Sequence, residues 1–362
     1  MAGPTTETGT LDVAGTANNP IPTLQPPPND TQLLQLADGG VGTNINNCFA
    51  AFGCEFNGPT TIVLDGPTSR VIRENEMTVT NANDYSGTPT KVDYPSNGVV
   101  YVNANTSAPL CSYAYTSFGT EDQLYGGTTL DPNTGDTANA GCGDAVVSGS
   151  TSTSDCPGTT QVAGVCPYTQ SLTIGAANDI IIGGSVTTTT ASSGCAGGET
   201  GGCPTGTALL GLIANDNVRI YHALVSTRPA PPAEGYCLAP ASNPSNTPYL
   251  NTNRADSLIN PTVDAAIFAI NDSFIIDDFD CGRTSDSGGN TALGTLTING
   301  TIAQNFRGRL ADGNPQFVGY VKNYWYDQRL ATIEPPYFLD PVSTNWSVTR
   351  LTECDGGSAA SC

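Results

Sequence analysis

The stretch Ala177-Asn178-Asp179-Ile180-Ile181-Ile182 places an Asn-Asp step directly before a run of apolar, β-forming residues. The same order recurs in Ala214-Asn215-Asp216-Asn217-Val218-Arg219-Ile220 and in Ile270-Asn271-Asp272-Ser273-Phe274-Ile275-Ile276, and each copy follows a short apolar run. Asparagine tolerates the left-handed backbone region at a bend, and its amide can hydrogen-bond to the equivalent Asn in the next turn of the chain. Strand, Asn-centred bend and strand, repeated along one chain, predict a coiled β-solenoid.

The three units are unequally spaced because loops of different composition separate them. Residues 191–205 are rich in Gly, Ser and Cys, and residues 226–259 are rich in Pro, Asn and Ser. With these loops set aside, each unit has roughly 22 residues, about one turn of a parallel β-helix. A fourth unit is expected at residues 295–302. We therefore predict an all-β chain that forms a right-handed parallel β-helix (solenoid) with long loop insertions. An antiparallel β-sandwich with Asn in its turns is the alternative.

The composition agrees with an all-β protein, and the net charge limits the classes of partner that it could bind. The 362 residues include 41 Gly and 26 Pro, which favours many turns and short strands over long helices. No apolar run is long enough to span a membrane. The chain has 12 basic and 33 acidic residues and a net charge of −21, so its surface should repel nucleic acid and anionic lipid. We expect neither as a partner.

The twelve cysteines predict disulfides and an oxidising compartment, outside the cell or on its surface. No C-x-x-C pair occurs and the single His is remote from any cysteine pair, so a zinc site is not expected. Reduced structural thiols are the alternative. Several cysteines bracket short loops, and two further pairs would close longer ones. The short pairs are Cys48/Cys54, Cys156/Cys166, Cys195/Cys203 and Cys354/Cys362, and the longer ones are Cys111/Cys142 and Cys237/Cys281.

Three segments are expected along the chain. Residues 1–45 are rich in Pro, Thr and Asn and predict an extended tail. Residues 46–318 hold the β-helix body with its loop insertions. Residues 319–362 hold an aromatic segment that would cap the open end of the stack, because an uncovered sheet edge invites aggregation. No signal peptide is visible at the start, so an exported chain is expected to begin after a removed export or anchoring segment.

Few residues suggest chemistry, and no catalytic residue is predicted. The sole histidine, His222, has no partner His or Cys nearby in sequence and is interpreted as a hydrogen-bonded structural residue. The carboxylates Asp277, Asp278 and Asp280 could bind Ca²⁺ through their oxygens. Alternatively, they form a solvated acidic turn. A third reading makes Asp277 and Asp278 the acid pair of a glycoside hydrolase or lyase. The Gly-His-Gly and Arg-x-Lys segments of polygalacturonase-like enzymes are missing. No other cofactor is expected.

A cluster of aromatic residues near the C-terminal end has two interpretations. Exposed on one face, these rings could stack on carbohydrate. At the spacing of a β-strand, however, half of them should pack on the core, and this second interpretation is favoured. The residues are Tyr320, Tyr324, Trp325 and Tyr326.

Several segments together resemble a largely uncharacterised family of bacterial envelope proteins described as pilin-like or pilus-assembly-associated. The resemblance implies a β-helical surface domain at the envelope or in an appendage. We therefore predict an extracellular protein with a structural or adhesive role, whose partners would be further copies in a filament, other envelope proteins or surface glycans. Such proteins usually carry an apolar N-terminal helix, which this chain lacks, and the family offers no catalytic residues to carry over. The segments are Leu172-Thr173-Ile174 with Asn178-Asp179-Ile180-Ile181-Ile182, Leu296-Thr297-Ile298-Asn299-Gly300-Thr301-Ile302-Ala303-Gln304, Tyr324-Trp325-Tyr326-Asp327-Gln328-Arg329-Leu330, Pro335-Pro336-Tyr337-Phe338-Leu339 with Trp346, Gly58-Pro59-Thr60-Thr61-Ile62 and Tyr94-Pro95-Ser96-Asn97-Gly98-Val99-Val100-Tyr101-Val102.

Overall fold

The structure is a computed structural model, and the description below concerns the compact unit Pro28–Phe338. Most of its regular structure is β, so the predicted all-β class is confirmed. One helix, α1 (Thr31–Asp38), and two short 3-10 turns, η3 (Thr153–Asp155) and η4 (Gln328–Ala331), accompany the strands in the described residues. The described residues are 29–38, 53–67, 75–81, 89–104, 143–191, 203–222, 224–225, 252–253, 258–277, 293–308, 310–312 and 318–339.

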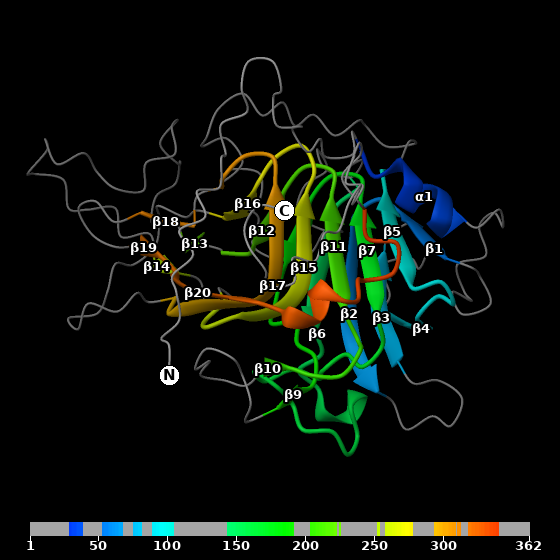
Figure 1. The fold of residues 1–362 in the computed structure, drawn as a ribbon, viewed down its shortest axis with the longest axis horizontal. Coiled ribbons are helices and arrows are strands. Elements are labelled where there is room, and N and C mark those ends of the chain that lie inside the picture. The colour runs from blue at the N-terminus through cyan, green and yellow to red at the C-terminus, as the bar shows by residue number, and fades with distance from the viewer. Residues whose placement is uncertain are drawn as a thin grey trace, which may run out of the picture. The chain divides into compact units, whose positions relative to one another are not determined.

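The first large sheet has seven strands, and every neighbouring pair in it is parallel. We call it sheet 1 (Figure 1). Its strands follow one another in chain order across the sheet, which an antiparallel β-sandwich would not produce. In spatial order they are β1 (Cys54–Asn57), β5 (Val99–Asn103), β7 (Leu172–Ala176), β11 (Leu210–Ala214), β15 (Thr262–Ala269), β17 (Thr295–Gln304) and β20 (Val321–Tyr326).

The second large sheet, sheet 2, also has seven strands but mixes two kinds of pairing. Five strands pair in parallel, and β3 and β4 add an antiparallel extension at one edge. The repeat in the sequence does not cover this extension and did not predict it. In spatial order the strands are β16 (Phe274–Ile276), β12 (Val218–Ile220), β8 (Ile180–Ile182), β6 (Ala145–Gly149), β2 (Thr60–Pro67), β3 (Asn75–Asn81) and β4 (Thr90–Asp93).

The chain passes alternately between the two sheets. Strands β7, β11 and β15 of sheet 1 are followed directly by the Asn-Asp bends and then by β8, β12 and β16 of sheet 2. Each Asn-Asp unit therefore supplies one strand to each sheet, in the predicted order of strand, bend and strand. Short antiparallel pairs stand beside the large sheets. They are β9 (Thr190–Ala191) with β10 (Cys203–Pro204), β13 (Leu224–Val225) with β14 (Thr252–Asn253), and β18 (Ala311–Asp312) with β19 (Val318–Gly319).

The hydrophobic core consists of apolar side chains stacked in register from strand to strand. In sheet 1, Leu212 lies opposite Ile174 on one side and Ile267 on the other, and all three are fully buried. In sheet 2, Val218 lies between Ile180 and Phe274 in the same way. Each fully buried aliphatic side chain contributes about 1.5–3 kcal/mol. The alternation of apolar residues in the repeat units thus produces continuous columns.

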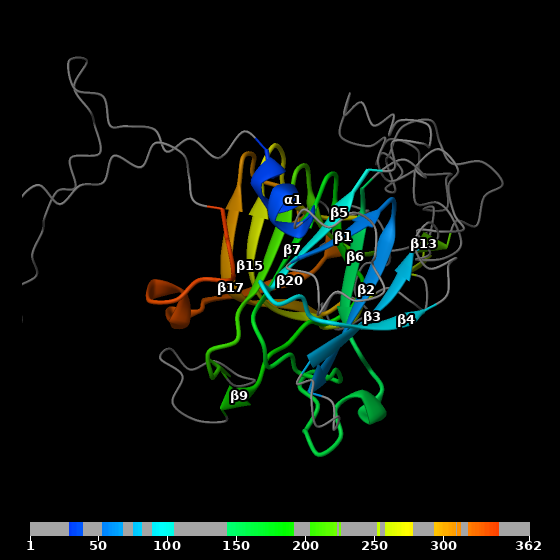
Figure 2. The same cartoon turned by 90° about the vertical axis from the view of Figure 1, so that its right-hand side faces the viewer.

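Helix α1 packs on the outer face of sheet 1, where an extended tail was predicted (Figure 2). Leu33 and Ala37 lie four residues apart on one helix face and are both buried. Gly175 of β7 provides the space, because a Cβ atom there would come within 3.0 Å of Leu33 Cδ1. The helix has only eight residues and lies within a segment rich in Pro, Thr and Asn, so the composition of that segment did not predict it.

A second segment, residues 333–338, covers the same face of sheet 1 farther along; we call it the strap. A Cβ atom on Gly211 would lie 2.9 Å from the ring of Phe338 and 3.1 Å from Pro335. The Thr173 hydroxyl donates a hydrogen bond to the carbonyl of Pro336. Within the predicted capping segment, β20 is the last strand of sheet 1 and the strap crosses the outer face of that sheet.

The disulfide between Cys156 and Cys166 is present, as the loop spacing predicted. Cys54 and Cys203 are also disulfide-bonded, and no described cysteine is free. The other eight cysteines of the prediction, Cys48, Cys111, Cys142, Cys195, Cys237, Cys281, Cys354 and Cys362, lie outside the described residues.

The Cys156–Cys166 bridge should contribute measurably to stability. It closes a loop with a sequence separation of 10 and packs beside Gly66 of β2. Replacing both cysteines with Ser should lower the free energy of unfolding by about 2–3 kcal/mol, mainly by releasing the unfolded chain. Urea titration followed by circular dichroism measures this loss. An unchanged urea midpoint of unfolding would show that the bridge does not contribute to stability.

Candidate functional site

Four polar residues form a buried column at the bends that lead into sheet 2; we call them the bend column. They are Asp144, Asp179, Asn217 and Ser273, and each immediately precedes a strand of sheet 2. The side chain of each of the first three accepts a hydrogen bond from the backbone N–H of the next member. Asp179 N donates to Asp144 Oδ1 (3.1 Å), Asn217 N to Asp179 Oδ1 (2.8 Å) and Ser273 N to Asn217 Oδ1 (3.3 Å). Successive turns of the chain are therefore joined by side chains as well as by strand pairing.

The predicted Asn ladder is only partly right. Asn271 Nδ2 donates to Asn215 Oδ1 at 3.4 Å, which is the expected contact between equivalent bends. Asn178, however, donates to Asp144 Oδ1 at 2.6 Å. Asn178 does not contact Asn215 in this way because the two residues occupy different positions in their bends. The N–H of Asp216 donates a hydrogen bond to the carbonyl of Asn178. Asn178 thus stands opposite Asp216 and not opposite Asn215.

Arg219 is the largest fully buried side chain, with 1% of its surface exposed. Its neighbours in β12 lie in the core, so Arg219 projects from the opposite face of sheet 2. Its Nε and Nη2 atoms lie 2.8 and 2.7 Å from Asp277 Oδ1, and its Nη1 atom lies 3.2 Å from Asp179 Oδ2. One guanidinium therefore joins carboxylates from two different turns.

Three carboxyl groups lie in the buried cluster around Arg219. Asp144, Asp179 and Asp277 are all buried, and Arg219 forms ion pairs with Asp179 and Asp277. Burial and the neighbouring Asp179 carboxylate raise the pKa of Asp144 to about 6, although hydrogen bonds from Asn178 and from the Asp179 N–H partly offset this rise. The cluster therefore holds a proton more readily than an exposed carboxylate would.

The structure places the predicted site residues in different situations. Asp277 is buried and ion-paired with Arg219, whereas Asp278 and Asp280 lie outside the described residues. Within the described ranges no group of three or more His, Cys, Asp or Glu side chains could hold a metal ion. His222 is buried, with Nδ1 3.0 Å from the Asp277 carbonyl oxygen, which agrees with a structural histidine.

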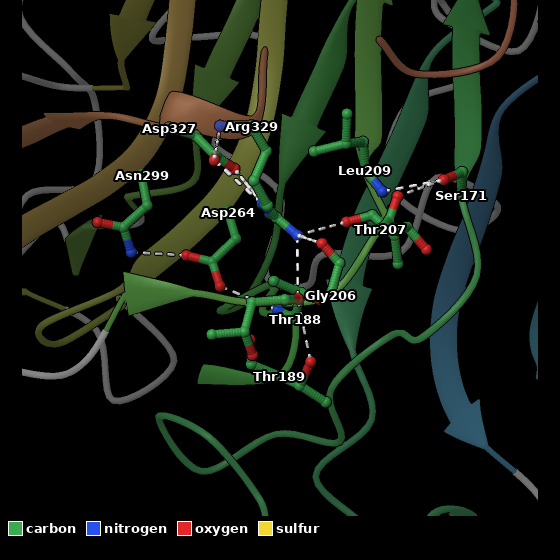
Figure 3. A network of polar contacts seen from close by, with 12 residues as sticks. Ser171, Thr188, Thr189, Gly206, Thr207, Leu209, Asp264, Asn299, Asp327 and Arg329 are labelled. Carbon is green, nitrogen blue, oxygen red and sulfur yellow. Dashed lines mark hydrogen bonds and ion pairs between the residues drawn. The ribbon is translucent and has the colours of Figure 1, made fainter. Parts of the chain in front are cut away.

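Figure 3 shows a second polar network, which fixes the segment leading into the strap. Arg329 Nη2 lies 2.6 Å from Asp327 Oδ2, and Arg329 Nε donates to both oxygens of Asp327 at 3.0 Å. Its Nη1 atom donates to the carbonyls of Thr205 (3.1 Å), Gly206 (3.4 Å) and Ala208 (3.0 Å). The side chain therefore clamps the C-terminal segment onto the loop before β11.

Asp264 occupies the centre of this region and is almost fully buried. Its two oxygens accept hydrogen bonds from the Thr188 N–H (2.9 Å) and from Asn299 Nδ2 (2.7 Å). Burial raises the pKa of Asp264 to about 6, although these two hydrogen bonds and the charge of Arg329 act against the shift. Both oxygens of Asp264 therefore accept hydrogen bonds from other residues of the fold.

We expect Arg329→Lys to loosen the strap. A lysine keeps the charge beside Asp327, but a single ammonium cannot reach both that carboxylate and three carbonyls, as the planar guanidinium does. The free energy of unfolding should fall by about 1–3 kcal/mol, and limited proteolysis should cut the strap first. The control is Arg307→Lys on an exposed turn, which should change neither quantity. Equal behaviour of the two variants would contradict the clamp.

The predicted aromatic cluster divides into buried and exposed members. Tyr320 is fully buried and its hydroxyl donates to the Leu258 carbonyl at 2.8 Å. Trp325 is half-buried and its Nε1 donates to Asn323 Oδ1 at 2.8 Å. Tyr324 and Tyr326 stay 39% and 58% exposed. Because β20 ends sheet 1, these two rings lie at the end of the stack.

Comparison with known proteins adds no further assignment. No family model matches the chain, and neither a curated protein nor a solved structure matches it. None of the helices in the described ranges could cross a membrane.

Sequence reasoning missed Arg219, Asp144 and Asp264 as network residues. The sequence did contain a signal for Arg219. It is one of only 12 basic residues in the chain, and it stands between two apolar residues of a repeat strand.

Proposed function

We propose that the chain is an extracellular or cell-surface protein with a structural or adhesive role, built on a right-handed parallel β-helix. The observation that carries this proposal is that buried polar side chains join successive turns of the chain. The bend column and Arg219 bond one turn of the chain to the next, which makes a rigid scaffold. The alternation of the chain between two sheets supports the helix, and parallel crossovers are almost always right-handed.

The disulfide between Cys156 and Cys166 supports a location outside the reducing cytosol. The net charge of −21 favours solubility and disfavours nucleic acid as a partner. Both properties suit a domain displayed on a cell or in an appendage.

Self-association into a pilus-like filament is part of the same proposal, with other envelope proteins or surface glycans as further partners. The resemblance of several segments to pilin-like envelope proteins supports it. The exposed Val321, Tyr324 and Tyr326 on the last strand of sheet 1 support it independently, because an edge strand with exposed apolar side chains favours association.

Electron microscopy and sedimentation of the purified chain over a wide concentration range test the filament. We expect assemblies that grow with concentration and are reduced by Tyr326→Glu. The control, Ile333→Glu, changes another exposed apolar residue, away from β20, and should assemble normally. Uniform monomers at high concentration would remove the filament from the proposal and leave adhesion.

A glycan panel tests the alternative, a carbohydrate-active enzyme that uses Asp277 and Asp278. We expect no turnover, because Asp277 is buried and its Oδ1 is bound by Arg219. Turnover by the parent that Asp277→Asn abolishes, in a variant that keeps its circular dichroism spectrum, would overturn the structural role.

A further inference from the structure

Strand β20 presents one row of backbone groups at the end of sheet 1. Its one strand neighbour is β17, and the two run parallel, with the Val321 N–H donating to the Gly294 carbonyl at 2.9 Å. Backbone groups of alternate residues point to opposite sides of a strand, so the odd-numbered residues bond to β17 and the even-numbered ones point away from it. None of the other backbone hydrogen bonds of the described residues ends on these even-numbered residues, which are Lys322, Tyr324 and Tyr326.

The side chains of the same three residues continue the columns of the core. Lys322 lies beside Leu296 of β17, and Tyr324 lies beside Ile298. Leu296 and Ile298 belong to the buried core, whereas the residues of β20 beside them are exposed. The end of sheet 1 therefore offers free backbone groups and an apolar extension of the core on the same three residues. An edge of this kind accepts a further strand.

The charge of β20 favours a second copy of this chain as the source of that strand. The chain has 33 acidic residues against 12 basic ones, so two copies repel each other over most of their surfaces. The six residues of β20 include one lysine and no acid, and Asp327, which follows them, is ion-paired with Arg329. Two copies can therefore meet along this strand without placing one unpaired carboxylate against another.

We propose that β20 pairs with β20 of a second copy, antiparallel and about a two-fold axis at Tyr324. Tyr324 then lies opposite Tyr324 of the second copy, and Lys322 lies opposite Tyr326. The free groups of the two strands exchange about six backbone hydrogen bonds in this register. The two Tyr324 rings meet on one face, and each lysine lies beside a tyrosine ring, where its charge is attracted. A register that places Lys322 opposite itself is disfavoured by repulsion.

This contact deepens the self-association in the proposed function and rests on that part of it. A two-fold contact uses the same patch on both copies and is complete at two. The dimer is therefore the first step of assembly, and a filament would grow from dimers through another surface.

Sedimentation velocity of the full chain over a wide concentration range tests the dimer. We expect monomers and dimers in equilibrium, and Tyr324→Pro should weaken the dimer by about tenfold or more, because the symmetry removes the lost hydrogen bond twice. The Tyr324 N–H does not bond to β17, so proline should leave the pairing of β17 with β20 intact, which the circular dichroism spectrum checks. Tyr324→Phe keeps this N–H and should dimerise as the parent does.

Cross-linking through an added cysteine tests the register and needs no proline variant. Directly opposed residues have Cα atoms about 5.5 Å apart, which suits a disulfide. Tyr324→Cys should therefore form a covalent dimer on a non-reducing gel. Tyr326→Cys should not, because it lies opposite Lys322 of the second copy.

Monomers at every concentration, or a covalent dimer from Tyr326→Cys and none from Tyr324→Cys, would overturn the proposal. Filaments that form equally well from folded Tyr324→Pro would overturn the two-fold contact and leave the filament. Dimers that never grow further would support the two-fold contact and remove the filament from the proposed function.

Discussion

Arg219→Met should lower the free energy of unfolding by about 3–5 kcal/mol, the largest effect of a single substitution that we expect in this protein. The side chain is 1% exposed and its guanidinium contacts Asp179 and Asp277. Methionine fills much of the same volume, but it leaves both carboxylates buried without that cation. Urea titration followed by circular dichroism and by intrinsic fluorescence measures the change.

Two further variants separate the lost ion pair from general damage. Arg307→Met removes the same charge at an exposed turn and should stay within about 0.5 kcal/mol of the parent. Combining Arg219→Met with Asp277→Asn removes one of the stranded charges, so the double variant should recover part of the loss. A loss below about 1 kcal/mol for Arg219→Met would show that the cluster is hydrated and contributes little.

Stability should rise as the pH falls from about 8 to about 5, which is unusual for a carboxylate-rich protein. The pKa of Asp144 and that of Asp264 are both raised to about 6, so between the unfolded value of 3.8 and 6 the folded state binds more protons. This contribution is fully present below 3.8 and is lost as the pH rises through about 6. A pKa unit corresponds to about 1.4 kcal/mol, so the two groups together amount to several kcal/mol.

Asp144→Asn identifies the residue responsible. Two hydrogen bonds to Asp144 end on Oδ1, from Asn178 Nδ2 and from the Asp179 N–H, and the Oδ1 atom of an asparagine can accept these two. The variant should therefore be more stable than the parent near pH 8 and should show a flatter dependence on pH. Glu334→Gln at an exposed position is the charge-matched control. Thermal unfolding in the presence of a chelator measures both. A parent whose stability falls on acidification over this range would contradict the prediction.

Local signals in the sequence predicted a substantial part of the fold. The Asn-Asp bends mark where β7, β11 and β15 end and where β8, β12 and β16 begin. The loop spacing of Cys156 and Cys166 predicted their bridge. These features are readable because a turn residue, an apolar run or a short loop is defined by neighbours in the chain.

The polar networks were not predictable in the same way. Arg219 stands between two apolar residues of a strand, a position that normally faces solvent on a half-buried sheet. Its partners lie 40 and 58 residues away, and the sequence does not say which turns become neighbours. Asp264 with Thr188 and Arg329 with the 205–208 loop are contacts of the same kind. Helix α1 was missed because three leucines and an alanine in an eight-residue helix make a weak pattern.

Local sequence features are enough to predict short β-strands joined by Asn-centred bends, the disulfide between Cys156 and Cys166 and an acidic surface. These properties follow from backbone preferences, side-chain periodicity and composition, which act over a few residues. The ion pairs of the buried carboxylates, in contrast, follow from the tertiary structure. Parallel pairing brings distant turns into register, and the charge beside each carboxylate depends on that register. Asp277 therefore lies beside Arg219, whereas Asp30 Oδ2 is buried and has no hydrogen-bond partner among the described residues.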